Sequence, residues 1–317
     1  MKIIFWASPD FALPTLEQLY LSEHEILAVV TQPDKRQGRK RNKIIYSPIK
    51  EFAQNKDIMV LQPNNPNKED FLNHIKSFNA DIMILVAYGQ ILCKKLLKIP
   101  TYGFLNIHLS LLPKYRGASP ITSSLLAGEE ETGVTIMKIV SKMDAGPVFG
   151  RANLPIKIED TKKTLEEKLG KLAPGLLLEI LTKLEKESII PEEQDHQKAT
   201  YCKILKKQDG KINWDLESNY LERFVRAMNP WPNAYTTLNR ADKKKSVLHI
   251  IIKKVQIIPD KVSQKPGTIV NITNQGIDVA TKDGCVRIVR LQKAGKNVID
   301  VKEFLQGNQI SKQDVFI

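Results

Sequence analysis

The sequence predicts an α/β domain followed by a smaller β-barrel domain. A chain of 317 residues is longer than one compact core usually holds, so two domains are expected. In the first half, apolar runs rich in β-branched residues alternate with stretches of helical spacing. After residue 230, short strand-like runs follow one another between glycine-containing turns, a pattern typical of a small barrel. A content of 42% hydrophobic and 26% charged residues is typical of a soluble globular protein.

Alternating strands and helices predict the order of the first domain. Its strands are expected at residues 2–6, 25–31, 58–62, 81–88 and 104–110, with helices at 11–21, 47–55 and 68–78. This order predicts a parallel sheet with helices on both faces. Ser8 and Ser119 each precede a proline, so each is expected to cap the helix that follows it.

The rest of the chain predicts the end of the first domain, a linker and the barrel. Residues 131–156 predict two more strands, and 160–187 predicts a long helix with a potential break at 173–175. The polar stretch 189–213 lacks a sustained period and suits a linker. A helix over 216–229 and five strands then predict the barrel, with the strands at 234–238, 247–258, 267–273, 277–281 and 285–291. The expected boundaries are 1–189 for the first domain, 190–208 for the linker and 209–317 for the barrel domain.

The spacing of the cysteines and the N-terminal residues limit the expected cellular location, metal binding and cofactor of the protein. Cys93, Cys202 and Cys285 are widely spaced with no CxxC pair, which argues against a disulfide framework and a zinc site, so no metal is expected. The first apolar run ends at residue 8, too short for a signal peptide or a membrane span, so a cytoplasmic protein without a membrane partner is expected. FWASPDF contains no glycine after the first strand, which disfavours a dinucleotide site.

Net charge is +13 and lies mostly in the C-terminal third. From residue 201 onward there are 21 Lys+Arg against 11 Asp+Glu, a net of +10, which leaves +3 for residues 1–200. Such asymmetry favours a polyanionic partner, because cations that neutralise phosphates release counterions. A lysine-rich surface that keeps the protein soluble is the alternative, and charge alone leaves both open.

Three polar residues predict an active site. Asn106 and His108 are two apart on an expected strand, so they share a face, and Asp144 follows 36 residues later in an Asp-Ala-Gly turn. An amide and a histidine that stabilise a developing oxyanion, with a carboxylate that biases the histidine and orders a water to relay a proton, suit acyl or formyl transfer to an amine. Spacing alone leaves open a hydrogen-bonded core role for His108.

The motifs around these residues resemble the folate-dependent formyltransferases, and within them the branch that formylates methionyl-tRNA. The resemblance spans nearly the whole chain, and it rests on Asn106-x-His108-x-Ser110-Leu111-Leu112-Pro113-x-x-Arg116-Gly117, Glu131 to Met137, Met143-Asp144-Ala145-Gly146, Ser8 to Ala12, Thr31-Gln32-Pro33-Asp34, Val86-Ala87-Tyr88-Gly89 and Arg226 to Pro232. It implies a Rossmann-like N-terminal domain and an OB-like barrel. It also implies transfer of the formyl group of 10-formyltetrahydrofolate to methionyl initiator tRNA.

Carried over by position, the resemblance gives each motif a role. Asn106, His108 and Asp144 match the catalytic trio. Folate binding is expected at two loops, formed by Ser110, Leu111, Leu112 and Pro113 and by Val86, Ala87, Tyr88 and Gly89. The resemblance also implies that Arg39, Lys40, Arg41 and Lys43, in a run with seven basic and no acidic residues over 35–50, contact the tRNA acceptor stem.

Further cations could continue a basic track for tRNA. They are Lys206, Lys207, Arg223, Arg226, Lys243, Lys244 and Lys245. Arg223 and Arg226 are three apart on the expected helix and so share a side. Trp231, between two prolines, is expected to be a buried anchor between the domains rather than a stacking platform. Arg116 either positions substrate or is solvated.

Four classes of function remain to be weighed. A formyltransferase acting on an amino-sugar nucleotide or a glycinamide ribonucleotide shares the trio but does not need the basic loop. A non-catalytic RNA-binding protein is disfavoured because all three members of the trio are present. A nicotinamide dehydrogenase is weakened by the missing glycine motif. Formyl transfer to initiator tRNA by a monomer is the leading hypothesis.

Overall fold

A computed structural model describes residues 1–37, 43–241, 247–260 and 262–317. The predicted tRNA contacts Arg39, Lys40, Arg41, Lys243, Lys244 and Lys245 lie outside these residues, and Lys43 is described only in its backbone. The chain forms two compact units. The first comprises residues 1–120, 131–156 and 165–202, and the second comprises 121–130, 157–164 and 203–317.

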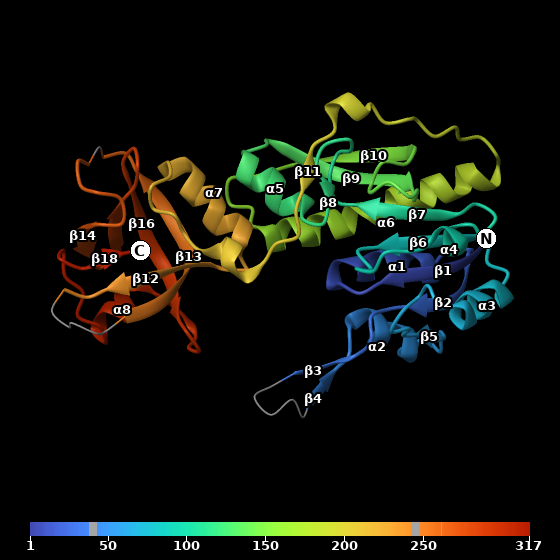
Figure 1. The fold of residues 1–317 in the computed structure, drawn as a ribbon, viewed down its shortest axis with the longest axis horizontal. Helices are drawn as coiled ribbons and strands as arrows, with labels where there is room; N and C mark the ends of the chain where they lie inside the picture. Colours follow the sequence, from blue (N-terminus) through green and yellow to red (C-terminus); the bar gives the residue numbers. More distant parts are fainter. Residues whose placement is uncertain (38–42, 242–246, 261) are drawn as a thin grey trace. The chain divides into compact units, whose positions relative to one another are not determined.

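The first unit is built on a seven-stranded sheet, which confirms the α/β class (Figure 1). In sheet order the strands are β10 (Val148–Pro155), β9 (Glu131–Lys138), β7 (Phe104–His108), β6 (Ile82–Val86), β1 (Lys2–Ala7), β2 (Glu25–Val30) and β5 (Val60–Leu61). The five strands from β7 to β5 are parallel, whereas β9 pairs antiparallel with β7 on one side and with β10 on the other. The predicted parallel sheet is therefore confirmed for the five strands that predicted it, and the two further strands expected within 131–156 extend it on the β7 side. A connection of only nine residues joins β9 to β10, and antiparallel neighbours need no long crossover.

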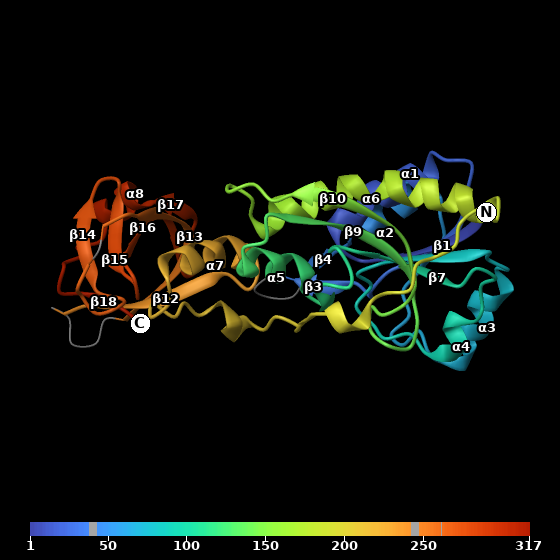
Figure 2. The ribbon, with the colours of Figure 1, turned by 90° about the horizontal axis from the view of Figure 1, so that it is seen from above.

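Helices cover both faces of this sheet (Figure 2). The helices of the unit are α1 (Leu13–Tyr20), α2 (Pro48–Asn55), α3 (Glu69–Ser77), α4 (Lys94–Leu97) and most of α6 (Lys162–Glu185). Helix α5 (Pro120–Ala127) begins directly after Ser119 and belongs, from residue 121, to the second unit. On one face, Leu72 and Ile75 of α3 pack with Leu96 of α4 against Ile4 and Trp6 of β1. No helix in the described part of the chain is long and apolar enough to cross a membrane.

Two local expectations for these helices need correction. Ser8 does not cap a helix, since a 3-10 turn, η1 (Asp10–Ala12), precedes α1. The Ser8 hydroxyl instead accepts a hydrogen bond from the backbone N–H of Gln32 at 3.1 Å, tying the end of β1 to the end of β2. The potential break at 173–175 does not occur, because α6 is continuous through Pro174.

The second unit is an antiparallel barrel, as predicted. Its strands, in sheet order, are β14 (Ile269–Thr273), β15 (Gly276–Ala280), β16 (Cys285–Lys293), β13 (Val247–Ile258), β12 (Ala234–Asn239) and β18 (Val315–Phe316), with β17 (Val298–Asp300) on β16. The last strand closes the barrel onto the first, because Phe316 N donates to the carbonyl of Gly267 at 2.9 Å and Thr268 bridges Val315. The predicted helix is α7 (Ser218–Met228). The short elements β17, α8 (Val301–Gln306) and β18 were not predicted, since so few residues show no period.

Barrel closure predicts an asymmetric effect of two glycine substitutions. Gly267 has φ +88°, and a Cβ there would lie 2.2 Å from the Phe316 carbonyl oxygen, whereas Gly295 has φ +74° and open space around it. Gly295→Ala should cost about 1 to 2 kcal/mol, the backbone penalty alone. Gly267→Ala should cost more, because it must also part the closing strands. Thermal unfolding of both variants measures the difference, and equal losses would contradict the closure.

Candidate active site

Asn106 and His108 lie on β7, the strand where the sheet changes from parallel to antiparallel. Both side chains are buried, with exposed fractions of 8% and 6%. Alternation along the strand places them on one face, with Leu105 and Ile107 on the other. Within the described part of the chain, the Asn106 side-chain amide has no hydrogen-bond partner. Its amide atoms are not among the fully buried polar atoms left without a partner, so the amide has accessible surface at which a ligand or substrate can form a hydrogen bond with it.

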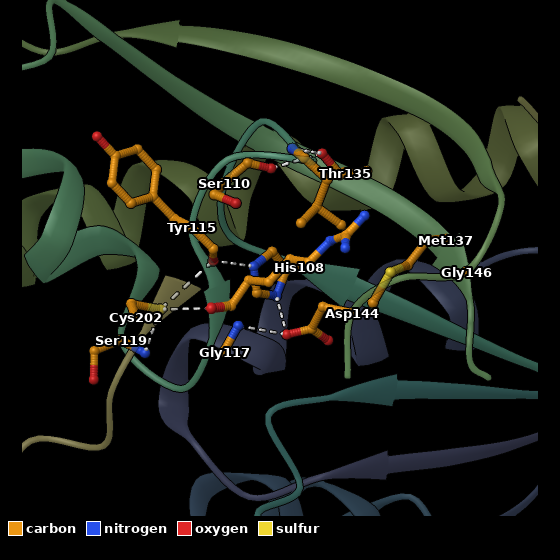
Figure 3. A network of polar contacts seen from close by, with 12 residues as sticks. His108, Ser110, Tyr115, Gly117, Ser119, Thr135, Met137, Asp144, Gly146 and Cys202 are labelled. Carbon is orange, nitrogen blue, oxygen red and sulfur yellow. Dashed lines mark hydrogen bonds and ion pairs between the residues drawn. The ribbon is translucent and has the colours of Figure 1, made fainter. Parts of the chain in front are cut away.

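The neighbours of His108 determine which of its ring nitrogens carries a proton and which faces Asp144 (Figure 3). Its Nε2 lies 2.9 Å from the backbone carbonyl oxygen of Tyr115, and a carbonyl only accepts, so Nε2 carries a proton and donates it there. The other ring nitrogen, Nδ1, faces Asp144 Oδ2 at 3.7 Å. Nδ1 is thus the ring nitrogen available for chemistry, with a carboxylate beside it.

Asp144 reaches this position from the loop between β9 and β10. Its backbone is left-handed, with φ +46°. The carboxylate is 16% exposed, and its Oδ2 accepts a hydrogen bond from Gly117 N at 2.7 Å. The structure therefore brings Asp144 to His108, as the sequence predicts, after α5 and β9 intervene. The catalytic roles of the trio stay predictions.

The loop Ser110–Pro113, expected to bind folate, is anchored by β9. Thr135, fully buried, donates from its hydroxyl to Ser110 O at 2.6 Å and accepts from Leu112 N at 3.1 Å. Leu112 is buried against Met137 and Val148, while Leu111 and Pro113 are half-buried. These contacts make the loop a rigid wall directly after His108.

The second expected folate loop, Val86–Gly89, lies beside the first. In the parallel register of β6 and β7, Leu85 pairs with Asn106, and continuing it by two residues places Ala87 level with His108. Ala87 and Gly89 are exposed with φ +45° and +85°, so they present backbone groups at the sheet edge. Tyr88 instead points into the core against Trp6, and burial raises the pKa of its hydroxyl to about 12.

The segment Thr31–Asp34 forms a polar network next to these loops. Lys50 Nζ contacts Asp34 Oδ2 at 2.5 Å and Gln62 Oε1 at 2.8 Å, and Gln62 Nε2 donates to Asp34 Oδ1 at 2.9 Å. Burial raises the pKa of the Asp34 carboxyl, but the hydrogen bonds from Lys50 and Gln62 outweigh this and lower it overall. The network lies at the start of β3 (Lys35–Gln37), which pairs with β4 (Lys43–Ile45).

Arg116 and Gln194 form a buried contact that sequence reasoning missed. Arg116 is fully buried, so the expectation that it is solvated or touches substrate is wrong. Its guanidinium donates to Gln194 Oε1 and to His196 Nδ1 at 2.9 Å. Gln194 lies in the polar stretch predicted to be a linker, and no local pattern distinguishes it from other glutamines.

The remaining predicted tRNA contacts differ in exposure. Lys206 and Lys207 are exposed. The guanidinium of Arg223 donates to Leu126 O, and that of Arg226 pairs with Glu222 at 2.6 Å and donates to Asp160 O. Both arginines therefore have structural contacts, and phosphate binding by them stays a prediction.

Trp231 does not form the buried anchor expected from the sequence. Its side chain is 50% exposed.

Models of known families identify the chain. The model described as formyl transferase matches residues 1–181, and that described as formyl transferase, C-terminal domain, matches 204–309. This chain belongs to the formyl transferase family. Within the described residues, no group of three or more His, Cys, Asp or Glu side chains could hold a metal ion.

Solved structures share the fold of this formyl transferase at low identity. HypX from Aquifex aeolicus is 16% identical with a TM-score of 0.64, and the match covers 98% of this chain but only 48% of HypX. An N-formyltransferase from Helicobacter canadensis is 17% identical with a TM-score of 0.64, covering 92% and 99% of the two chains. Methionyl-tRNA formyltransferase from Clostridium thermocellum is 14% identical with a TM-score of 0.57, covering 90% and 100%.

Two threonines on β9 give opposite expectations for the same substitution. Thr135→Val removes the hydroxyl that satisfies Ser110 O and Leu112 N, and each group left unpaired costs about 1 to 3 kcal/mol. Thr132 is a matched control, since its buried hydroxyl has no partner among the described residues. Thr132→Val should leave stability unchanged or raise it. Thermal unfolding of the two variants checks the sign, and a comparable loss in both would refute the anchoring role of Thr135.

Proposed function

We propose that this formyl transferase moves the formyl group of 10-formyltetrahydrofolate to the α-amino group of methionyl initiator tRNA. The observation that carries formyl transfer is the Asn106 amide, bonded to no described residue and placed on the same face of β7 as His108. Asp144 faces the free nitrogen of that histidine at 3.7 Å. Together these groups suit a site where negative charge develops on a carbonyl oxygen.

The donor fits the two loops at the end of β6 and β7. The wall made by Leu111 to Pro113 offers apolar contact to a ring system, and the exposed backbone at Ala87 and Gly89 offers hydrogen-bonding groups to a pterin edge. The Helicobacter canadensis relative was solved with folinic acid, a formylated folate. In this proposal Ser110 orders the wall through its hydrogen bond to Lys114 O at 2.7 Å.

The reaction requires charge stabilisation more than a strong base. An α-amino group is roughly a tenth neutral at pH 7, so freeing it costs about 1.4 kcal/mol. The amine nitrogen attacks the formyl carbon, and the Asn106 amide and protonated His108 Nδ1 hold the oxyanion. Asp144 orders a water that accepts the amine proton and delivers it to N10 of the folate as the C–N10 bond breaks. Formylated amine and tetrahydrofolate are the products.

Alanine substitution of the trio separates these roles. Asn106→Ala should lower kcat by about 10²- to 10³-fold, since loss of one oxyanion donor costs about 2.7 to 4 kcal/mol. His108→Ala and Asp144→Ala should lower kcat as well, while KM for the folate donor changes little in all three. Steady-state kinetics measures this. Near-normal turnover in any variant removes that residue from its proposed role.

Charge supports tRNA as the acceptor. The basic segment 35–43 and the net charge of +10 from residue 201 onward match a polyanion. Lys206 and Lys207 are exposed at the start of the second unit. The second candidate acceptor is an amino-sugar nucleotide, favoured by the similarity to the Helicobacter canadensis enzyme, which was solved with dTDP-3-aminofucose.

A direct comparison of acceptors tests the choice. With 10-formyltetrahydrofolate as donor, formylmethionine should form on charged initiator tRNA, and a dTDP-amino sugar should be formylated far more slowly. Affinity for the tRNA should fall steeply between 50 and 200 mM salt, because phosphate contacts release counterions. Charge reversal at Lys243, Lys244 and Lys245 should reduce that slope. Faster transfer to the sugar, or binding insensitive to salt, argues against tRNA.

A further inference from the structure

We propose that Gln194 is a positioning residue, which ties the turn carrying Asp144 to the buried Arg116 and so keeps the carboxylate in register with His108. The inference rests on the proposed function for the role of Asp144 in formyl transfer. It adds a group outside the catalytic trio, from the polar segment that follows α6, to the set on which the reaction depends.

Each hydrogen-bonding position of the Gln194 amide is occupied. Its Oε1 accepts from Arg116 Nε at 3.1 Å and from Nη2 at 2.7 Å. Its Nε2 donates to Asp144 O at 3.0 Å and to Gly146 O at 2.7 Å. A guanidinium only donates and carbonyls only accept, so the amide has one possible orientation. At 5% exposure, Gln194 is a buried bridge between a cation and the main chain of the turn.

The bridge holds the inner side of a turn whose outer side is exposed to solvent. Ser141, Lys142 and Met143 are exposed, and Asp144 adopts a left-handed backbone that a non-glycine residue rarely takes. The turn is held from within, by Gly117 N on the carboxylate and by Gln194 on the carbonyls. Arg116 and Gly117 are consecutive residues of β8 (Arg116–Gly117), so one short strand provides both anchors.

Arg116 is a fixed anchor. Its side chain is fully buried, and its backbone N–H donates to Thr200 O at 2.8 Å. β8 pairs in parallel with β11 (Tyr201–Cys202), which brings Tyr201 OH to 3.4 Å from Arg116 Nη1. Residues 192–202 therefore pack along the active-site loops, and Gln194 is the residue among them that is buried.

Gln194→Glu tests the bridge without changing its size. One carboxylate oxygen of the glutamate still pairs with Arg116, and this buried ion pair maintains the fold. The other oxygen replaces the amide donor and faces the carbonyl oxygens of Asp144 and Gly146. Because these oxygens repel one another, the turn moves away. We expect kcat to fall about 10- to 100-fold, the effect of a displacement near 1 Å, with KM for the folate donor unchanged. The melting temperature should be unchanged or higher.

A double-mutant cycle shows whether Gln194 acts through Asp144. In the Asp144→Ala background, Gln194→Glu should lower kcat less than about 2-fold further, since residues acting through one interaction are not additive. Gln197→Glu is the matched control, because it makes the same change on an exposed side chain of the same segment and should leave kcat at the parent value. If Gln194→Glu melts below the parent, Gln194→Met, which keeps the length and loses both polar ends, repeats the cycle.

A crystal structure of Gln194→Glu gives a readout independent of the acceptor. The Asp144 carboxylate should have left hydrogen-bond distance of Gly117 N, which is 2.7 Å in the parent. An Asp144 carboxylate still bonded to Gly117 N, an unchanged kcat, or an equal further loss in the Asp144→Ala background would each overturn the inference. A parent enzyme that transfers no formyl group refutes the proposed function alone, since the position of Asp144 in the variant is still decisive for the bridge.

Discussion

The pairing of β7 with a parallel strand on one side and an antiparallel strand on the other determines the arrangement of the candidate site. Parallel pairing with β6 places the end of that strand level with His108. Antiparallel pairing with β9 sets Thr135 opposite His108 and Met137 opposite Asn106. A slip of one residue in either register would turn both polar side chains to the opposite face of the sheet. The loop Ser110–Pro113 directly follows this strand, and Asp144 lies beside its last residue, His108.

The residues around β7 fall into two groups, according to whether other protein groups occupy their hydrogen-bonding atoms. Thr135, Gln194 and Arg116 are buried with their hydrogen-bonding groups occupied, which suits a rigid support. Asn106 is buried with its amide unoccupied by any described residue, and His108 has one nitrogen occupied and the other turned to a carboxylate. The supporting groups thus differ from the candidate reactive groups in whether protein partners occupy their hydrogen-bonding atoms.

The second unit follows a different principle. Its residues close a barrel through main-chain bonds between its last and first strands, and its apolar side chains form a separate core that includes Trp214, Phe304 and Phe316. Because this core is separate, the excess of positive charge on the second unit does not depend on the packing around the candidate catalytic residues. The family models match the two parts of the chain separately, in keeping with two cores.

Much of the first unit was determined by the sequence itself. Near-continuous apolar runs predicted β1, β2, β6 and β7, because strands buried on both faces need such runs, and period two placed Asn106 and His108 on one face. The motif order also identified the family. Strands β9 and β10 were predicted without a direction, and only the structure shows that β9 is the reversed strand, since direction depends on which neighbour a strand pairs with.

Only the tertiary structure decided the burial of Arg116, the role of Gln194 and the exposure of Trp231. Arg116 is followed by residues typical of a loop, so sequence reasoning expects a solvated cation or a substrate contact. Burial of that charge becomes tolerable when Gln194, 78 residues later, and His196 supply acceptors. Local patterns report on periodicity within one element. They carry no information on a partner that long-range folding brings to the same place, which is why the supports of the site were invisible in the sequence while its reactive residues were not.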